Sequence, residues 1–374
     1  MLIDSTLREG AQAYGVYFST AARRRMAEIM AAAGVDEIEC GWLGQEGLPE
    51  FMAWAREKLP RLEQGGPALS LWCPCREADV REAAALGVDR LNIGAPSSSA
   101  HRQKRLGLSL AEMCERVDYV VGAARAAMVP YISVGLEDVS RAAPHEALAL
   151  ARVAVQAGAS RIRLSDTVGV LTPLSTARLL GSFLREIAVP VAFHGHNDLG
   201  MATANAVTAL ECGAGFVDVS ALGLGERAGI AALEEVAAWL ALRASAAMQG
   251  QAVYDVPALR ELCRLAAQAA KTTVPRNKAV AGEDVFAAES GIHVHGLLRD
   301  PSLFEPFAPE AVGATRRVGV GSKSGGAAVS ATLARLSRPS DRGCGGDASL
   351  MERVRTLACR LGRPLTDSEL LGVL

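Results

Sequence analysis

The chain has 374 residues, of which 50% are hydrophobic and 21% charged, and its formal net charge is −2. This balance is typical of a globular protein with room for more than one domain, and the lack of a basic excess argues against a nucleic acid partner. No run of about 18 uncharged apolar residues predicts a membrane span, and the N-terminus lacks the features of a secretion signal. We therefore expect a cytoplasmic protein whose eight cysteines are mostly buried, reduced thiols.

A helical segment, a glycine and a short β-branched strand recur as a unit along the first two thirds of the chain. Gly34, Gly87, Gly158 and Gly213 stand where a helix C-terminus favours a left-handed residue. The strands that follow are short and apolar, as expected when both faces are covered. The predicted strands are 2–5, 35–40, 68–72, 90–94, 130–134, 161–165, 190–195 and 216–221. The predicted helices lie near 19–33, 46–58, 76–86, 109–127, 144–157, 173–187, 201–211 and 229–246.

Eight strand–helix pairs in succession predict a (β/α)₈ TIM barrel of the α/β class. A doubly wound open sheet is the alternative, but it requires a glycine-rich turn after the first strand, and TLREGAQAYG (6–15) has none. We expect the barrel over residues 1–248 and a linker or subdomain contributing to the active site over 249–334. Residues 335–374 are expected to form a linker and a small helical segment, with a helix cap at TDSE (366–369).

The seventh predicted strand ends in FHGHND (193–198). His194 and His196 are two residues apart and share one face of that strand, and the C-terminal ends of barrel strands build the active site. Two imidazoles directed at one point suit a divalent metal ion. The alternative is a pair of hydrogen-bonded core histidines.

The first strand leads into IDSTLREG (3–10), which places Asp4, Arg8 and Glu9 at its end. A carboxylate there would complete a two-histidine, one-carboxylate face that leaves positions open for a chelating substrate. The fifth and sixth strands also end in polar clusters, LED (136–138) and SDT (165–167). Because apolar layers normally fill a barrel interior, these clusters predict an active site at the barrel mouth.

Several long motifs together resemble a known family. DSTLREGAQ, SVGLEDVSRA, RLSDTVGVLTP, FHGHNDLGMATANAVTALECGAGFVDVSALGLGERAG and ESGIHVHGLL are similar, in this order, to the Claisen-condensing branch of the DRE-TIM metallolyase superfamily. That branch contains isopropylmalate, citramalate and homocitrate synthases. The resemblance covers roughly residues 2–325, and STLREGAQAYGVYFS with SVGLEDVSRA is most similar to the homocitrate synthases that serve nitrogenase-cofactor assembly.

The resemblance implies a role for individual side chains. Glu9, His194 and His196 would bind a divalent metal (Mg²⁺, Mn²⁺ or Zn²⁺), Arg8 would polarise the carbonyl of a 2-oxo acid, and Gln12 and Thr167 would help to hold that acid. Glu137 and His293 would belong to the acid/base machinery. The resemblance also implies acetyl-CoA as co-substrate, 2-oxoglutarate as acceptor, and a homodimer in which the C-terminal region reaches the barrel of the partner subunit.

The loop GLGERAG (223–229) precedes the last barrel helix. Through Gly223 and Gly225 it could receive the phosphates of CoA, and close packing of the loop is the alternative. For the remote carboxylate of a dicarboxylic substrate, the sequence offers His101, Arg102 and the serines of APSSSAHRQ (95–103).

Three positions differ from the family motifs. Ile230 stands where Asn is usual, Phe304 where Tyr is usual, and Lys323 where His is usual. The same chemistry on 2-oxoisovalerate, pyruvate or oxaloacetate, a retro-aldol lyase and a non-catalytic binding protein remain as alternatives at this point.

Overall fold

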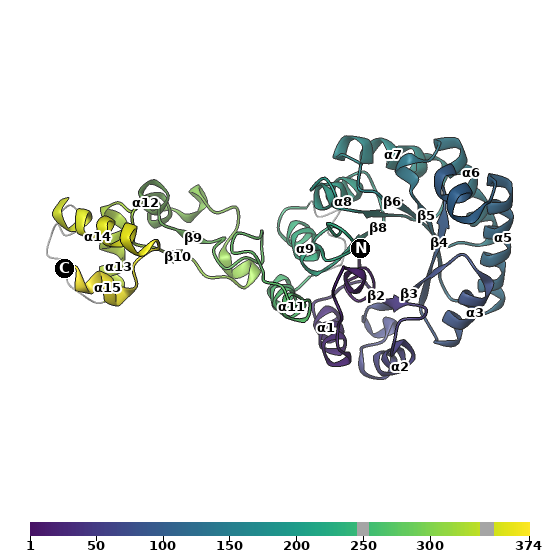
Figure 1. The fold of residues 1–374 in the computed structure, drawn as a ribbon, viewed down its shortest axis with the longest axis horizontal. Coiled ribbons are helices and arrows are strands. Elements are labelled where there is room, and N and C mark those ends of the chain that lie inside the picture. Colours follow the sequence, from purple (N-terminus) through teal and green to yellow (C-terminus); the bar gives the residue numbers. More distant parts are fainter. Residues whose placement is uncertain (245–253, 337–347) are drawn as a thin grey trace. The chain divides into compact units, whose positions relative to one another are not determined.

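The computed structural model describes residues 1–244, 254–336 and 348–374. The chain forms two compact units, Met1–Val274 and Pro275–Leu374 (Figure 1). The helix α11, Val256–Ala269, belongs to the first unit and packs against α1, Thr20–Ala32. The first unit therefore extends beyond residue 248, where the sequence placed its end.

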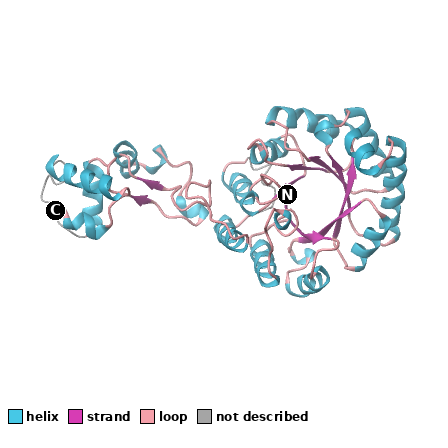
Figure 2. Cartoon of the chain, viewed as in Figure 1, coloured by secondary structure: helices cyan, strands magenta, loops and turns pink. Residues whose placement is uncertain are grey.

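The first unit contains a closed barrel of parallel strands in the order β1 to β8, in which β1 pairs with both β2 and β8. Figure 2 shows the strands inside a ring of helices. This confirms the predicted TIM barrel, and each strand lies within a few residues of its predicted position. The strands are β1 Leu2–Asp4, β2 Glu37–Trp42, β3 Ala68–Pro74, β4 Arg90–Pro96, β5 Ile132–Glu137, β6 Arg161–Asp166, β7 Val191–Gly195 and β8 Phe216–Val219.

The helices of the barrel follow the predicted segments. After α1 come α2 Leu48–Lys58, α3 Glu77–Ala85, α5 Leu110–Ala126, α6 Pro144–Ala157, α7 Pro173–Glu186, α8 Ala202–Glu211 and α9 Leu233–Leu242. The predicted end of the last of these, near residue 246, lies outside the described residues. Short helical turns line the loops: η1 Gly10–Gln12, η2 Leu62–Gln64, α4 Ser99–His101, η3 Arg102–Leu106, η4 Val139–Arg141 and η5 Ala221–Gly223.

Local sequence explains where these helices begin and end. Ser109 and Glu112 form a capping box at the start of α5, which satisfies two backbone N–H groups that have no partner within the helix. Gly158 follows α6 with φ of 113°, and Gly34, Gly87 and Gly213 also have positive φ. A residue with a Cβ is strained in this conformation, so the glycines mark the turns into the strands, as predicted.

The apolar core lies between the strands and the helices. Ile38, Ile162 and Phe193 point outward from the strands and belong to the same buried cluster as Met26 of α1 and Leu150 of α6. Since side chains alternate along a strand, their neighbours point into the barrel.

The interior of the barrel contains layers of buried charged residues beside a small apolar cluster of Ile3, Ala192 and Phe216, so the apolar layers that we expected are only a part of it. Glu37 and Arg161 are fully buried, and Arg161 Nη1 lies 2.8 Å from Glu37 Oε2. Arg90 Nη1 lies 2.8 Å from the same oxygen, and the Asn92 amide links this layer to Glu39 in the next one, at 2.9 Å. Burial disfavours the charge on Glu37, but the arginines outweigh it and lower the pKa of Glu37 to about 2.

The second unit has its own small core, formed by Val294, Val329, Leu333, Val354 and Leu370. It contains the two-stranded sheet β9 Ala287–Ala288 and β10 Arg317–Val318. Its helices are α12 Gly291–Arg299, η6 Pro301–Leu303, η7 Pro309–Val312, α13 Gly326–Arg335, α14 Ala348–Leu361 and α15 Asp367–Gly372.

The end of the chain is helical, as predicted, and Thr366 and Glu369 form the expected capping box of α15. Of the linker predicted before α14, residues 337–347 lie outside the described residues. Within the described ranges, no helix has the length and apolar character needed to cross a membrane.

Candidate active site at the barrel mouth

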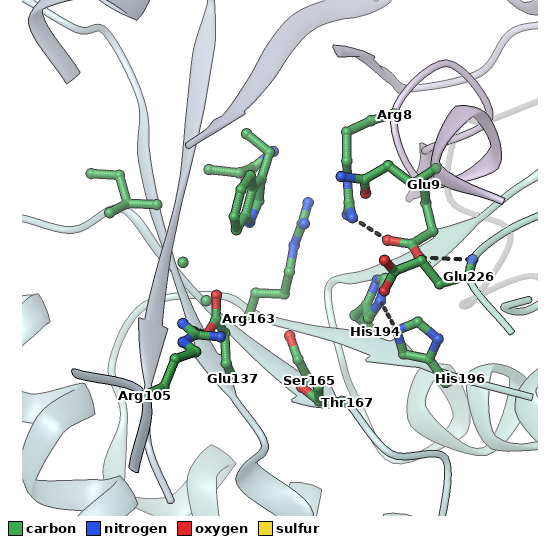
Figure 3. A pocket seen from close by; sticks show the side chains of 16 residues that line it. Arg8, Glu9, Arg105, Glu137, Arg163, Ser165, Thr167, His194, His196 and Glu226 are labelled. Carbon is green, nitrogen blue, oxygen red and sulfur yellow. Dashed lines mark hydrogen bonds and ion pairs between the residues drawn. The ribbon is translucent and has the colours of Figure 1, made fainter. Parts of the chain in front are cut away.

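Glu9, His194 and His196 come together at the C-terminal ends of β1 and β7 (Figure 3). One potential ligand atom from each lies within 4.8 Å of the others, and all three residues are buried. The two Nε2 atoms of the histidines are 3.2 Å apart. Adjacent ligands at about 2.1 Å from a metal ion are separated by about 3 Å. The structure thus brings the three predicted metal ligands to one point.

The orientation of His194 is set by a carboxylate on β8. His194 Nδ1 lies 2.7 Å from Asp218 Oδ2, and Arg163 Nη1 lies 3.1 Å from the same oxygen. A carboxylate oxygen accepts the hydrogen bond, so His194 donates from Nδ1 and keeps a lone pair on Nε2. A carboxylate behind a ligand histidine is a recurrent feature of metal sites.

His196 is prepared in a similar way. Burial, which disfavours the charged imidazolium, lowers the pKa of His196 to about 3. A neutral imidazole is the form that binds metal ions, and the donor set of two imidazoles and one carboxylate is a common one. The residues present therefore fit a divalent metal ion.

Glu9 carries the negative charge of the triad. Burial opposes ionisation, but the positive charge of Arg8 favours it, and the pKa of Glu9 lies below its usual value. Glu9 is ion-paired with Arg8, and Arg8 Nε lies 2.6 Å from Glu39 Oε2. Arg8 is thus held between two carboxylates beside the triad, where its charge can polarise a substrate oxygen.

These groups surround a cavity of about 240 Å³ that opens at the barrel mouth. Its lining includes three further residues predicted from the sequence, Gln12, Glu137 and Thr167. Glu137 Oε2 lies 2.5 Å from Arg105 Nη2, and Gly94 leaves the space that Glu137 occupies, because a Cβ there would lie 2.5 Å from Glu137 Oε1. Thr167 Oγ1 accepts a hydrogen bond from the backbone of Asp138 at 2.8 Å.

The residues that the sequence offered for a remote carboxylate do not line this cavity. Arg102 is buried elsewhere, where it donates to the backbone of Ser97 and lies 2.9 Å from Glu146. Ser98 donates to Asp138 at 2.5 Å, and His101 lies 3.7 Å from the same carboxylate. The loop after β4 is instead bound mainly to Asp138 and to Glu146 of α6. The cations that line the cavity are Arg8, Arg105 and Arg163.

The glycine loop lies against the triad. A Cβ at Gly225 would stand 3.0 Å from Glu9 Cγ, and the backbone N–H of Glu226 donates to Glu9 Oε1 at 3.2 Å. Gly223 has φ of 70°, and a Cβ there would lie 2.7 Å from the Ile230 carbonyl. The contacts of Gly223 and Gly225 are therefore those of close packing. Ile230 forms a backbone bridge with His196 and is buried.

His293 lies on α12 in the second unit. It is exposed, and its ring meets the Phe304 ring edge-on at a centroid distance of 4.6 Å. Both residues, with Lys323, line a cavity of about 850 Å³ in that unit. A proton donor or acceptor in such a position is open to a ligand from outside the unit.

The sequence analysis missed Glu39, Asn92, Arg163 and Asp218. Each is a buried polar residue inside a short apolar strand. A signal was present, because EIEC (37–40) and RIRL (161–164) place charges two residues apart, which aims both side chains into the barrel.

The fold and the site define a TIM-barrel enzyme whose polar mouth is suited to a divalent metal. The chain matches the model of the HMGL-like family over residues 1–265 and the homocitrate synthase post-HMGL domain over residues 280–342. It belongs to the HMGL-like family, and the two matches in this order confirm the resemblance to the homocitrate synthase group.

Individual relatives agree with this assignment. The chain is 40% identical to the homocitrate synthase of Frankia alni, over 87% of this chain and 90% of the relative. It is 36% identical to 2-isopropylmalate synthase 2 of Caldanaerobacter subterraneus, over 99% and 94% of the two chains. Among solved structures, the HMG-CoA lyase of Bacillus subtilis has a TM-score of 0.63 at 20% identity and covers 74% of this chain and 95% of its own. The last comparison shows the barrel fold alone.

Proposed function

We propose that this protein condenses acetyl-CoA with 2-oxoglutarate to give (R)-homocitrate and CoA. The main observation in support is that Glu9, His194 and His196 come together beside Arg8 in a cavity at the barrel mouth. The post-HMGL domain and the Frankia relative support homocitrate as the product.

Glu9, His194 and His196 would hold the divalent ion, for which Mg²⁺, Mn²⁺ and Zn²⁺ are the candidates. When bound, such an ion would be chelated by the 2-oxo acid and would stabilise negative charge on its keto oxygen. Arg8 adds a fixed positive charge beside that oxygen. Gln12 and Thr167, which line the same cavity, would orient the carboxylate of the oxo acid.

The acetyl methyl group of acetyl-CoA must lose a proton before it attacks the keto carbon. A positioned carboxylate or imidazole can take that proton, and we assign this acid/base work to Glu137 and His293. Water then cleaves the thioester and releases CoA. Gly223 and Gly225 would lie near the CoA phosphates. Because both glycines are tightly packed, they could contact the phosphates only through the backbone of their loop.

We further propose a homodimer in which the second unit of one subunit serves the barrel of the other. Support comes from the family resemblance and from the exposure of His293. The motifs of the first and fifth strands favour a role in nitrogenase-cofactor assembly. The seven cysteines in the described part of the chain form no disulfide, which agrees with a place in the reducing cytoplasm.

The same condensation on another 2-oxo acid is the second candidate. It is favoured by the isopropylmalate synthase relative, which is only slightly less identical than the homocitrate synthase. A monocarboxylic substrate such as 2-oxoisovalerate would leave the inner end of the cavity without a charged ligand.

The test is release of free CoA thiol by the purified protein with acetyl-CoA, Mg²⁺ or Mn²⁺, and a panel of 2-oxo acids. We expect the highest kcat/KM with 2-oxoglutarate, loss of turnover with a chelator, and (R)-homocitrate as the product by chiral chromatography. His194→Ala serves as the inactive control. A preference for 2-oxoisovalerate or pyruvate, or turnover that chelators leave intact, would contradict the proposal.

A further inference from the structure

Arg163 lies at the inner end of the cavity at the barrel mouth. It comes from β6, where Arg161, Arg163 and Ser165 point inward at successive levels. In the strand register, Ser165 is level with His194 and Arg163 is level with Ala192. The backbone of Arg163 is therefore two residues, or about 6.6 Å, deeper than the backbone of His194. Figure 3 shows its side chain crossing the cavity between Arg8 and Ser165.

Only one corner of the Arg163 guanidinium has partners. Nη1 lies 3.1 Å from Glu39 Oε1 and 3.1 Å from Asp218 Oδ2. Nε and Nη2 are buried and have no hydrogen-bond partner among the described residues. A buried donor without a partner lowers the stability of the folded protein. We therefore expect Nε and Nη2 to bind an acceptor that comes from a ligand.

The chemistry of the unused donors specifies the acceptor. Nε and Nη2 form one edge of the planar guanidinium, and that edge can bind both oxygens of a carboxylate side-on. Because the site is shielded from water, such charge-assisted hydrogen bonds are strong. A planar carboxylate fits this edge better than a single hydroxyl or carbonyl group.

The other cations of the cavity are already engaged. Arg8 is held by Glu9 and Glu39. Arg105 is paired with Glu137 and half of its side chain is exposed. Within the described ranges, Arg163 is the cavity-lining arginine with two buried, unpaired donors.

We propose that Arg163 binds the remote carboxylate of the oxo acid and thereby selects dicarboxylic over monocarboxylic substrates. This inference rests on the proposed function, since it assumes that the 2-oxo acid end lies at Glu9, His194 and His196. From there, the two methylene carbons of 2-oxoglutarate carry its remote carboxylate further into the cavity, where Arg163 is the lining arginine with unpaired donors.

The test pairs a change in the substrate with a change in the protein. The two substrates are 2-oxoglutarate and 5-methyl-2-oxohexanoate, in which an isopropyl group of similar shape replaces the remote carboxylate. The proteins are the wild type, Arg163→Met and Arg163→Lys, and the readout is the ratio of kcat/KM for the two substrates. General damage to the site lowers both values and cancels in the ratio.

In the wild type we expect a ratio of at least about 100, because an apolar tip would leave the buried donors unpaired. Arg163→Met should lower the ratio to below about 10, mainly through a loss on 2-oxoglutarate. Arg163→Lys keeps the positive charge but loses the two-donor edge of the guanidinium, so its ratio should lie between the other two. If Arg163→Met does not fold, the wild-type and Arg163→Lys ratios still decide the matter.

A wild-type ratio near one overturns the inference, and so does an unchanged ratio in both variants. Synthesis of homocitrate with an unchanged ratio would refute the role of Arg163 and leave the proposed function standing. The protein could instead be active on oxaloacetate and not on 2-oxoglutarate, and Arg163→Met could abolish its preference for a dicarboxylic substrate. That result would refute the proposed substrate and support the role of Arg163.

Discussion

At the scale of single residues, the site depends on how buried charges are paired. Asp218 Oδ2 contacts both His194 and Arg163, and Glu39 contacts both Arg8 and Arg163. Asp218 thus links His194 to Arg163, and Glu39 links Arg8 to Arg163. Removal of one partner leaves a buried charge uncompensated, which is more damaging than the loss of a surface ion pair.

Asp218→Asn should weaken metal binding by about 10–100-fold, the usual effect of losing the group behind a ligand histidine. The amide can present its N–H₂ to His194 Nδ1, which favours the tautomer with the proton on Nε2. Titration calorimetry with Mn²⁺ measures the effect. Asp118→Asn, the same change on the exposed face of α5, is the control. Equal Mn²⁺ affinity in Asp218→Asn and the wild type would contradict this account of His194.

Glu37 predicts how stability varies with pH. Its pKa is about 2 in the folded protein, against 4.5 for the free side chain. Because the folded value is the lower one, the contribution is fully present above pH 4.5 and is lost as the pH falls towards 2. The difference corresponds to about 3 kcal/mol.

We therefore expect the free energy of unfolding of the wild type to fall more steeply between pH 4.5 and 2 than that of Glu37→Gln. Denaturant titrations across this range provide the measurement. Glu50→Gln, at an exposed helix position, should retain the wild-type slope. Parallel pH profiles for the wild type and Glu37→Gln would show that Glu37 does not contribute in this way.

At the scale of elements, the site is assembled from strand ends and one glycine loop. The triad comes from the ends of β1 and β7, Asp218 from β8 and Glu137 from β5. The loop 223–229 packs on Glu9 from above β8, and its glycines allow an approach that a Cβ would prevent. The loop thereby fixes one wall of the metal-suited site.

Gly225→Ala should displace Glu9, because the new Cβ would stand 3.0 Å from Glu9 Cγ and 3.2 Å from Gly229 Cα. We expect activity to fall by about 10–100-fold, since small displacements of reacting groups have effects of that size. Steady-state kinetics and Mn²⁺ titration are the measurements.

The matched control is Gly122→Ala on the exposed face of α5, where a Cβ would meet nothing within 4 Å. This change should stabilise the protein by about 0.5–1 kcal/mol and leave activity intact. Wild-type activity in Gly225→Ala would mean that the loop adapts without moving Glu9.

At the scale of the whole molecule, the side chains to which we assign the chemistry are divided between two compact units. The first contains the triad and the cavity at the barrel mouth, and the second contains His293, Phe304 and Lys323 around a cavity of its own. We therefore expect substitutions in the second unit to change turnover without changing metal affinity.

His293→Ala should lower kcat by about 10²–10⁴-fold, the typical contribution of an acid/base group, and leave the Mn²⁺ affinity unchanged. His145→Ala, on the exposed face of α6, should change neither quantity. Thiol-release kinetics and calorimetry together test this prediction. A parallel loss of metal affinity in His293→Ala would place His293 among the groups that support the metal, and wild-type kcat would remove it from catalysis.

Much of this protein was accessible from local sequence. The eightfold repeat predicted the barrel because helix-ending glycines and short apolar strands are local features, and all eight strands were found in order. His194 and His196 were predicted to share a face because side chains alternate along a strand. Glu9 was assigned through the family motif, and the structure places it beside them.

The remaining features depend on which strands face one another across the barrel. The sequence suggested Arg102 for a remote carboxylate, but Glu146, 44 residues away, engages it. Glu39, Arg163 and Asp218 lie on β2, β6 and β8 and meet only after the barrel closes. Local patterns therefore determined the elements and the two histidines. The tertiary structure decided how charges from distant strands are paired, because burial makes an unpaired charge too unfavourable to tolerate and so selects the partners.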